Sequence, residues 1–375
     1  MKVALVHDQL QEFGGAERVL VALKEIFPEA DVYTSFYNPL TLGKHADKFK
    51  DWNIKSSWAQ KVPGFKKFYS PLRFITPWIW ESFDFREYDI VISSSGAYMT
   101  KGIITRPDTL HICYIHHQPR YLYYYETARE WQRYWPIRIY AHYINHGLRI
   151  WDYLSSQRPD FFIANSQETQ RRVQKFYRRD STVIYPPVNI PDNVVITEQP
   201  SNYYLTLSRL ARAKHIEILI NAANKYKFNL KIGGTGKDET FLKSIAGPTV
   251  EFLGSVKDSD FTKLYTGAKA FLNAAVDEEF GISVVEALGY GLPVIGYASG
   301  GVKETIQDSK NGYLYHELNE DALYKKIKLL ESLDNHEYQA MKKNARSSAE
   351  KYSFENFKKQ ILEFVNSKTH HNHNA

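Results

Sequence analysis

The chain has 375 residues, of which 43% are hydrophobic and 24% charged, and its formal net charge is +6. A chain of this length is too long to fold around one compact core, so two domains are expected. Its composition is that of globular proteins and excludes a largely disordered chain. The single cysteine, Cys113, excludes an internal disulfide, and no apolar run is long enough to cross a membrane. The opening residues lack the pattern of a signal peptide, and we expect a cytoplasmic protein.

The first half of the chain alternates short apolar runs with helical stretches. The expected strands cover residues 2–7, 31–35, 89–93, 111–115 and 161–164, with a helix at 15–26 and a long helix before the last strand. A polar, proline-rich stretch at residues 186–201 then interrupts the alternation and is the predicted linker.

The second half repeats the same alternation. Its expected strands cover residues 203–207, 230–233, 250–253, 270–272 and 293–296, with helices starting near residues 214, 238, 258 and 281. Strands alternating with helices predict an α/β fold with parallel sheets covered on both faces. We therefore expect two doubly wound domains, 1–190 and 200–352, facing across a cleft. A helix at 353–366 is expected to return toward the first domain, followed by a disordered tail at 367–375.

Two glycine-rich loops follow expected strands. Gly14 and Gly15 precede a helix, where paired glycines allow close backbone approach and present free amides to a phosphate. The three spaced glycines of a dinucleotide-binding loop are absent, so hydride transfer is disfavoured. Gly234 belongs to the run Gly-Gly-Thr-Gly-Lys, which lacks the spacing and the hydroxyl residue of a phosphate-binding P-loop. We interpret it as a strand-to-helix turn near a ligand.

Two histidines and two acids are candidates for catalytic or metal-binding groups. His116 and His117 follow an expected strand, where a neutral imidazole could contact a sugar hydroxyl or phosphate, or accept a proton. Packing histidines are the alternative. Asp258 and Asp260 have the spacing of a manganese-binding pair, but a helix cap is the preferred interpretation. No metal is expected.

Two cations follow the strand expected at residues 203–207. Arg209 and Lys214 suit a diphosphate, because Arg can grip it with a fork and Lys with a point charge. The alternative is a pair of solvated bases at a helix start, where the helix dipole disfavours them.

The run from Glu278 to Glu286 is the most informative in the chain. It predicts Glu278 in a loop after a buried strand and Glu286 about one turn into the next helix. Ligands of open α/β sheets bind in such a crevice, and Gly281 allows a phosphate to approach the helix start. The two carboxylates could then accept hydrogen bonds from sugar hydroxyls. The alternative is a solvated acidic loop.

Basic and aromatic residues are interleaved at residues 66–80 and 121–140. Such clusters suit a membrane surface with anionic lipid, single-stranded nucleic acid, or a tyrosine-rich packing face. We favour the membrane surface among the functional options, and no nucleic-acid partner is expected.

Taken together and in their order along the chain, these residues resemble glycosyltransferase family four, the retaining enzymes of the GT-B fold. The resemblance implies that Arg209 and Lys214 hold the diphosphate of a nucleotide-sugar donor, Glu278 its sugar and Glu286 its ribose. His116 would lie near the reacting carbon, and no cofactor is implied. The remaining residues of the implied donor site are Gly14, Gly15, Gly234, Phe280, Gly281 and Ile282.

The residues Pro119-Arg120-Tyr121 look most like the mannosyltransferases of surface-polysaccharide and O-antigen assembly, which use GDP-mannose and lipid-diphosphate acceptors. His116 is preferred over His117 because it precedes Arg120 by four positions, which is the spacing typical of the histidine in that mannosyltransferase branch. The family usually has Thr or Asn after that histidine, and here His117 follows it. The alternatives are a UDP-sugar transferase, an epimerase or hydrolase of the same fold, and a non-catalytic carbohydrate or nucleic-acid binder.

Overall fold

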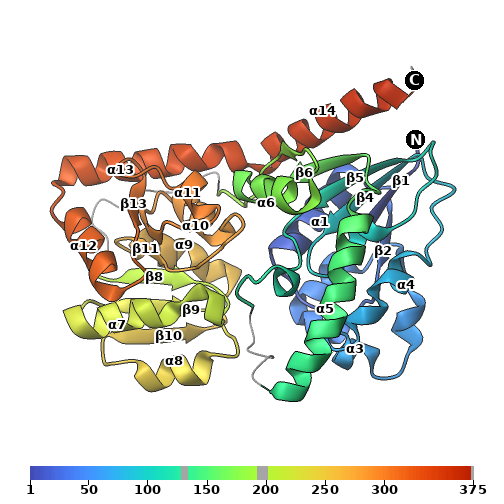
Figure 1. Ribbon diagram of the computed structural model, residues 1–375. Helices are drawn as coiled ribbons and strands as arrows, with labels where there is room; N and C mark the ends of the chain where they lie inside the picture. Colours follow the sequence, from blue (N-terminus) through green and yellow to red (C-terminus); the bar gives the residue numbers. More distant parts are fainter. Residues whose placement is uncertain (128–133, 192–201, 373–375) are drawn as a thin grey trace. The chain divides into compact units, whose positions relative to one another are not determined.

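The computed structural model describes residues 1–127, 134–191 and 202–372, which form two compact units (Figure 1). The first unit contains residues 1–125, 134–187 and 354–372, and the second contains residues 126–127, 188–191 and 202–353. Most of the predicted linker falls at residues 192–201, outside the described residues. Each unit is a parallel sheet with helices on both faces, so the predicted α/β class is confirmed.

The sheet of the first unit has the strand order β3-β2-β1-β4-β5-β6-β7. The strands are β1 (Val3–His7), β2 (Asp31–Thr34), β3 (Ile54–Ser56), β4 (Ile90–Ser95), β5 (Leu110–Ile115), β6 (Phe161–Ala164) and β7 (Thr182–Val183). In the register of this sheet His7 lies opposite Ser94, and Ser95 lies opposite Ile115. The polar ends of β1 and β4 therefore lie at the same edge as the end of β5, which His116 follows.

Alternate side chains of β1 enter different hydrophobic clusters, as the pleat of a strand requires. Val3 and Leu5 pack with α1 (Gly15–Ile26) and with α14 (Phe354–Asn372). Ala4 and Val6 instead join a cluster of mostly aromatic side chains from residues 33–98. The other helices of this unit are α2 (Pro39–Leu42), α3 (Phe65–Phe68), α4 (Thr76–Trp80), α5 (Trp135–Ser155) and α6 (Gln167–Tyr177).

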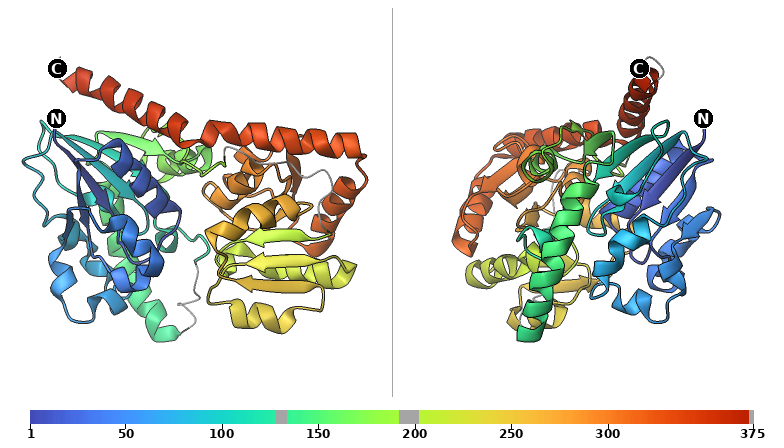
Figure 2. Two further views of the ribbon diagram at one scale, coloured as in Figure 1. Left: turned by 180° about the vertical axis from the view of Figure 1, so that it is seen from behind. Right: turned by 45° about the vertical axis from the view of Figure 1, so that its right-hand side comes forward.

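The sheet of the second unit has the order β10-β9-β8-β11-β12-β13 and is also parallel (Figure 2). Its strands are β8 (Tyr204–Leu207), β9 (Leu230–Gly233), β10 (Val250–Gly254), β11 (Phe271–Asn273), β12 (Val294–Tyr297) and β13 (Gly312–Tyr315). Its helices are α7 (Ile216–Tyr226), α8 (Glu239–Ile245), α9 (Asp258–Gly267), α10 (Ile282–Gly289), α11 (Val302–Thr305), α12 (Glu320–Glu331) and α13 (Asn335–Ala349). Because β8 and β11 are neighbours, the loops that follow them start side by side.

One helix start agrees with prediction and one helix end differs. Helix α9 begins at Asp258, as predicted, and the backbone of Lys257 makes that residue the N-cap. Helix α14 continues to Asn372, past the predicted end at residue 366, because no Gly or Pro interrupts the added turns. Residues 373–375 of the predicted tail lie outside the described part. Among the described helices, none has the length and apolar character to cross a membrane.

Candidate functional site

A cation and an acid meet at the carboxyl edge of the second sheet. Lys214 ends a short 3-10 turn (Arg212–Lys214) after β8, and its ammonium group hydrogen-bonds Glu278, which follows β11. Their side chains are 22% and 19% exposed, so both remain within reach of a ligand. The two residues are 64 positions apart in sequence, and only the adjacency of β8 and β11 brings them together.

The loop that carries Glu278 is held by backbone contacts. The amide of Val276 donates to the carbonyl of Ala213 at 3.1 Å, joining this loop to the turn before Lys214. The amide of Gly301 donates to the carbonyl of Glu278 at 2.7 Å. A Cβ atom on Gly300 would lie 2.0 Å from that carbonyl oxygen, so only glycine permits this approach.

The loop that carries Arg209 rests on the glycines after β9. Gly234 has φ +122°, and a Cβ atom there would lie 1.9 Å from the carbonyl oxygen of Ser208. A Cβ atom on Gly236 would lie 2.1 Å from the carbonyl oxygen of Leu210. These glycines therefore support the backbone on either side of Arg209, whose own side chain is exposed. The predicted strand-to-helix turn is confirmed, but its contacts are to protein backbone.

Helix α10 starts where the acidic run predicts. Gly281 is its N-cap with φ +89°, Ile282 is its first residue, and the half-buried Glu286 lies about one turn inside it. Phe280 does not offer its ring to solvent, because the side chain is buried against Tyr352 with ring centroids 5.2 Å apart. Phe280, one of the predicted donor-site residues, can therefore contact a ligand only through its backbone.

In the first unit, His116 belongs to a chain of buried polar side chains. Its Nε2 lies 2.8 Å from Ser94 Oγ, and the same hydroxyl lies 2.9 Å from Nδ1 of His7. The Nε2 atom of His7 faces Glu17 Oε1 at 3.5 Å. Burial alone would raise the pKa of Glu17, but hydrogen bonds, from His7 and from the amide of Gly14 among others, outweigh it and hold that pKa below its usual value.

Gly14 and Gly15 lie at the start of α1, as predicted. Gly14 is the N-cap and Gly15 the first helical residue. The amide of Gly14 donates to Glu17 Oε2 at 2.8 Å, so the prediction of a free amide is wrong for this glycine. The reason is local, because a Glu at the third helical position reaches back to the cap residue.

His117 has a different environment from His116. Its Nδ1 lies 2.8 Å from the carbonyl oxygen of Gln118, which assigns the proton to that nitrogen. A Cβ atom on Gly96 would lie 3.2 Å from His117 Nε2 and 3.1 Å from Asp8 Oδ2. Asp8 accepts hydrogen bonds from three backbone amides of the loop 96–100, and burial raises its pKa.

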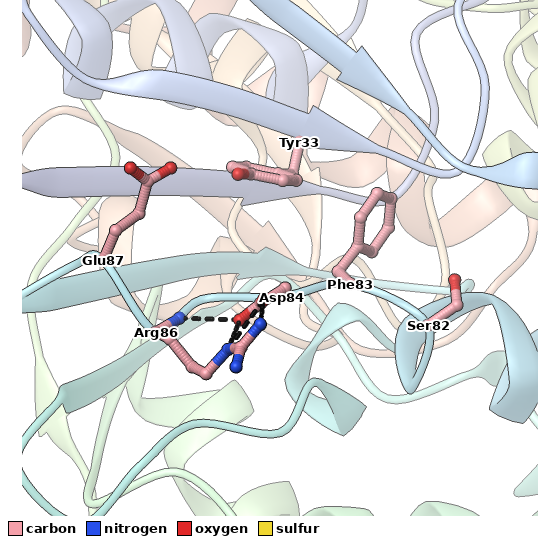
Figure 3. Close-up of a pocket in the computed structure, with 6 residues that line it drawn as sticks. All are labelled: Tyr33, Ser82, Phe83, Asp84, Arg86 and Glu87. Carbon is pink, nitrogen blue, oxygen red and sulfur yellow. Dashed lines mark hydrogen bonds and ion pairs between the residues drawn. The ribbon is translucent and has the colours of Figure 1, made fainter.

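A separate hollow of about 540 Å³ opens beside β2 (Figure 3). Its lining residues are Tyr33, Ser82, Phe83, Asp84, Arg86 and Glu87. Residues 82–87 precede β4, so they approach the amino ends of the strands, whereas His7 and His116 lie at the carboxyl ends. The charges of Asp84 and Arg86 pair with each other. This hollow is therefore separate from the candidate site at the carboxyl ends of the strands.

The sequence patterns did not predict His7 and Ser94, which belong to the chain of His116, or Asp8, which lies by the loop near His117. A usable signal was present, because polar residues directly end the expected strands at residues 2–7 and 89–93. Buried polar side chains at the carboxyl ends of adjacent parallel strands mark a candidate site.

Two family comparisons cover most of the chain. Residues 13–191 match the family described as Glycosyltransferase Family 4, and residues 192–348 match the family described as Glycosyl transferases group 1. The two matches adjoin and fall on the two halves of the chain. The chain belongs to the glycosyltransferases of the GT-B fold.

Curated relatives of this glycosyltransferase chain include two streptococcal proteins. Both are UDP-N-acetylglucosamine–peptide N-acetylglucosaminyltransferase GtfA subunits. The Streptococcus gordonii protein is 31% identical over 44% of this chain and 35% of its own length. The Streptococcus pneumoniae protein is 24% identical over 66% of this chain and 50% of its own length. The chain thus spans half or less of these relatives.

Solved structures resemble the glycosyltransferase over nearly its whole length. Anabaena HepE, solved in complex with UDP and glucose, has a TM-score of 0.71 at 19% identity, with coverage of 98% of this chain and 100% of that one. Sucrose-phosphate synthase from Thermosynechococcus elongatus has a TM-score of 0.73 at 16% identity, with coverage of 98% and 99%. At these identities the likeness establishes the fold.

Proposed function

We propose that the chain transfers a sugar from a nucleotide diphosphate-sugar to a hydroxyl acceptor, with retention of the anomeric configuration. The observation that carries the proposal is the meeting of Lys214 and Glu278 at the carboxyl edge of the second sheet. A cation suited to a diphosphate would then lie beside an acceptor for sugar hydroxyls, on loops that glycines hold in place.

In the proposed reaction the leaving diphosphate gains negative charge as its bond to the sugar breaks. Lys214 and Arg209 would stabilise this charge, and the first amides of α10 would add the positive end of a helix. Glu278 would accept hydrogen bonds from the donor sugar and Glu286 from the ribose. By the family resemblance, His116 would contact the donor sugar near the reacting carbon.

For the donor we propose a uridine diphosphate-sugar. The streptococcal relatives are named for UDP-N-acetylglucosamine and the Anabaena structure contains UDP, and this supports uridine over guanosine. The resemblance to GDP-mannose enzymes receives no support from these relatives. A mannosyltransferase is therefore the second candidate, and GDP-mannose belongs in every assay.

For the acceptor side we propose a lipid surface that docks on α5. The solvent face of this helix carries large apolar side chains together with the exposed His142 and His146. Ile139, Tyr143, Ile150 and Leu154 are 51%, 72%, 51% and 57% exposed and lie opposite the buried Ala141, Asn145, Leu148 and Asp152. A face of this kind on a long helix suits the boundary between headgroups and acyl chains.

The charge around α5 suits an anionic lipid surface. Residues 134–151 include Arg138 and Arg149 but no acid, and residues 52–80 include five bases and no acid. The two segments touch, because the hydroxyl of Tyr140 donates to the carbonyl of Pro71, and α5 passes α3 and α4 (Figure 1). Exposed aromatic rings at Trp58, Phe68 and Trp78 add apolar contact area near these bases.

The test is a donor screen. The chain is incubated with UDP-glucose, UDP-N-acetylglucosamine or GDP-mannose and a glycolipid acceptor, and product is measured by mass spectrometry. The proposal expects acceptor-dependent product from one donor, with an anomeric proton coupling that matches the donor. Release of free sugar or epimer without acceptor would instead indicate a hydrolase or epimerase. Absence of turnover and of nucleotide binding would contradict the proposal.

A further inference from the structure

Four buried side chains link the start of α1 to His116 through hydrogen-bonding atoms. The order is Glu17, His7, Ser94 and His116, with successive contacts of 3.5, 2.9 and 2.8 Å. All four are less than 9% exposed. Ser94 is central, because its single hydroxyl lies between two imidazole nitrogens.

A serine hydroxyl can donate only one hydrogen bond. If Ser94 donates to Nδ1 of His7, then Nε2 of His116 must carry a proton and donate to Ser94. If Ser94 donates instead to His116, then Nδ1 of His7 must carry the proton. The tautomers of the two histidines are therefore coupled, and the rest of the chain decides between the two patterns.

When His7 is neutral, Glu17 determines which of the two hydrogen-bond patterns forms. A carboxylate only accepts hydrogen bonds, and the amide of Gly14 already donates to its other oxygen. Although 3.5 Å is a long contact, a buried negative charge facing Nε2 of His7 favours the tautomer that has a proton on that nitrogen. Nδ1 of His7 is then an acceptor, Ser94 donates to it, and Nε2 of His116 donates to Ser94.

We infer that Glu17, His7 and Ser94 are positioning residues that fix neutral His116 as the tautomer with its proton on Nε2. Nδ1 of His116 then carries the lone pair. The consequence of this tautomer rests on the proposed function: His116 would meet a sugar hydroxyl as a hydrogen-bond acceptor and not as a donor. Two further contacts hold His116 in place, from Asn165 Nδ2 to its carbonyl oxygen at 3.0 Å and from the ring of Tyr114 at a centroid distance of 5.2 Å.

The strand also supplies a matched control. Ser93, next to Ser94 on β4, is equally buried, and its hydroxyl lies 2.9 Å from Nε2 of His111. Ser93→Ala therefore removes a buried serine–histidine contact of the same kind without touching the chain to His116.

The test is the imidazole tautomer itself. Nitrogen-15 shifts of labelled histidine are recorded without substrate at about pH 8, where an ordinary histidine is neutral, and the His116 signals are assigned with His116→Gln. Wild type and Ser93→Ala are expected to have the proton on Nε2. Ser94→Ala and Glu17→Gln are expected to give a mixture of tautomers. A wild-type His116 protonated on Nδ1, or an unchanged tautomer in Ser94→Ala, would overturn the inference.

Turnover gives a second measurement that separates this inference from the proposed function. Ser94→Ala is expected to lower kcat about tenfold with little change in the donor KM, and His116→Gln to lower it further. An unfolding midpoint equal to that of Ser93→Ala excludes a folding defect. If wild type transfers no sugar, the proposed function fails, while the tautomer result still decides the inference.

Discussion

At the residue scale, Lys214 and Glu278 each supply the other's counter-charge. A diphosphate that takes the ammonium group of Lys214 would release Glu278 to accept hydrogen bonds from sugar hydroxyls. The two residues should therefore respond differently to substitution, although they form one ion pair.

We predict that Glu278→Gln binds UDP at least as tightly as wild type, because Lys214 loses its competing carboxylate. The same variant should transfer sugar at least tenfold more slowly, because an amide replaces the charged acceptor of the sugar hydroxyls. Calorimetry with UDP and a turnover assay check the two parts. Weakened UDP binding together with normal turnover would contradict this assignment.

Gly234 supports the loop of Arg209 through a close backbone approach. Substitution of this glycine should therefore lower the free energy of unfolding of the second unit. Gly234→Ala is expected to cost more than about 3 kcal/mol, since a Cβ atom would overlap the carbonyl oxygen of Ser208 and φ is positive. Gly254 also has positive φ but nothing within 4 Å of a Cβ atom. Gly254→Ala should therefore cost only about 1 kcal/mol. Equal unfolding free energies in urea would show that the close approach is not needed.

At the element scale, many helices and strands could be predicted from sequence. Helix α1 and strand β6 have the predicted bounds, because periodic apolar residues and clear end signals coincide there. Strands β3 and β7 were missed because their three and two residues show no periodicity, and the four-residue β13 was missed as well. The placement of Glu278 and Glu286 around Gly281 followed from local pattern. The contact of Lys214 with Glu278 depends on strand order, which no local pattern encodes.

Helix α5 should govern binding to anionic vesicles. The double variant Ile139→Glu, Ile150→Glu is expected to bind phosphatidylglycerol vesicles at least about tenfold more weakly, since it loses apolar contact and adds negative charge. Both positions are exposed, so the fold should be unaffected. Leu329→Glu, on α12 of the second unit, is the control at a similar exposure of 46%. Equal cosedimentation of all three proteins would exclude α5 as the docking face.

Helix α14 should stabilise the first unit although it follows the second unit in sequence. Phe357, Ile361 and Val365 are buried in the core beneath α1. Phe357→Ala is expected to lower the free energy of unfolding by about 3–5 kcal/mol. Substitution of the exposed Glu355 by Ala should change it by no more than about 0.5 kcal/mol.

Tryptophan fluorescence measures this effect selectively, because all seven tryptophans precede residue 152. The prediction is a lower urea midpoint for Phe357→Ala by this signal. If fluorescence-detected unfolding is the same in both variants, α14 does not contribute to the first unit.

At the scale of the whole molecule, the charged groups of the second unit and the buried histidine chain of the first unit both lie at the carboxyl ends of parallel strands. Such ends are where open α/β sheets bind ligands. The central claim is that the second unit's edge holds a nucleotide diphosphate. A saturating diphosphate at about a hundred times its Kd should add roughly 2.7 kcal/mol to the free energy of unfolding.

The most direct test of this claim is calorimetric binding of UDP and GDP to three proteins: wild type, Lys214→Ala and Lys225→Ala. Lys225 is an exposed lysine of the same unit that pairs with Asp321, so it controls for the loss of one positive charge. We predict that one nucleotide binds wild type and Lys225→Ala equally, and binds Lys214→Ala about 10- to 100-fold more weakly. Equal affinity for Lys214→Ala and wild type would contradict the account.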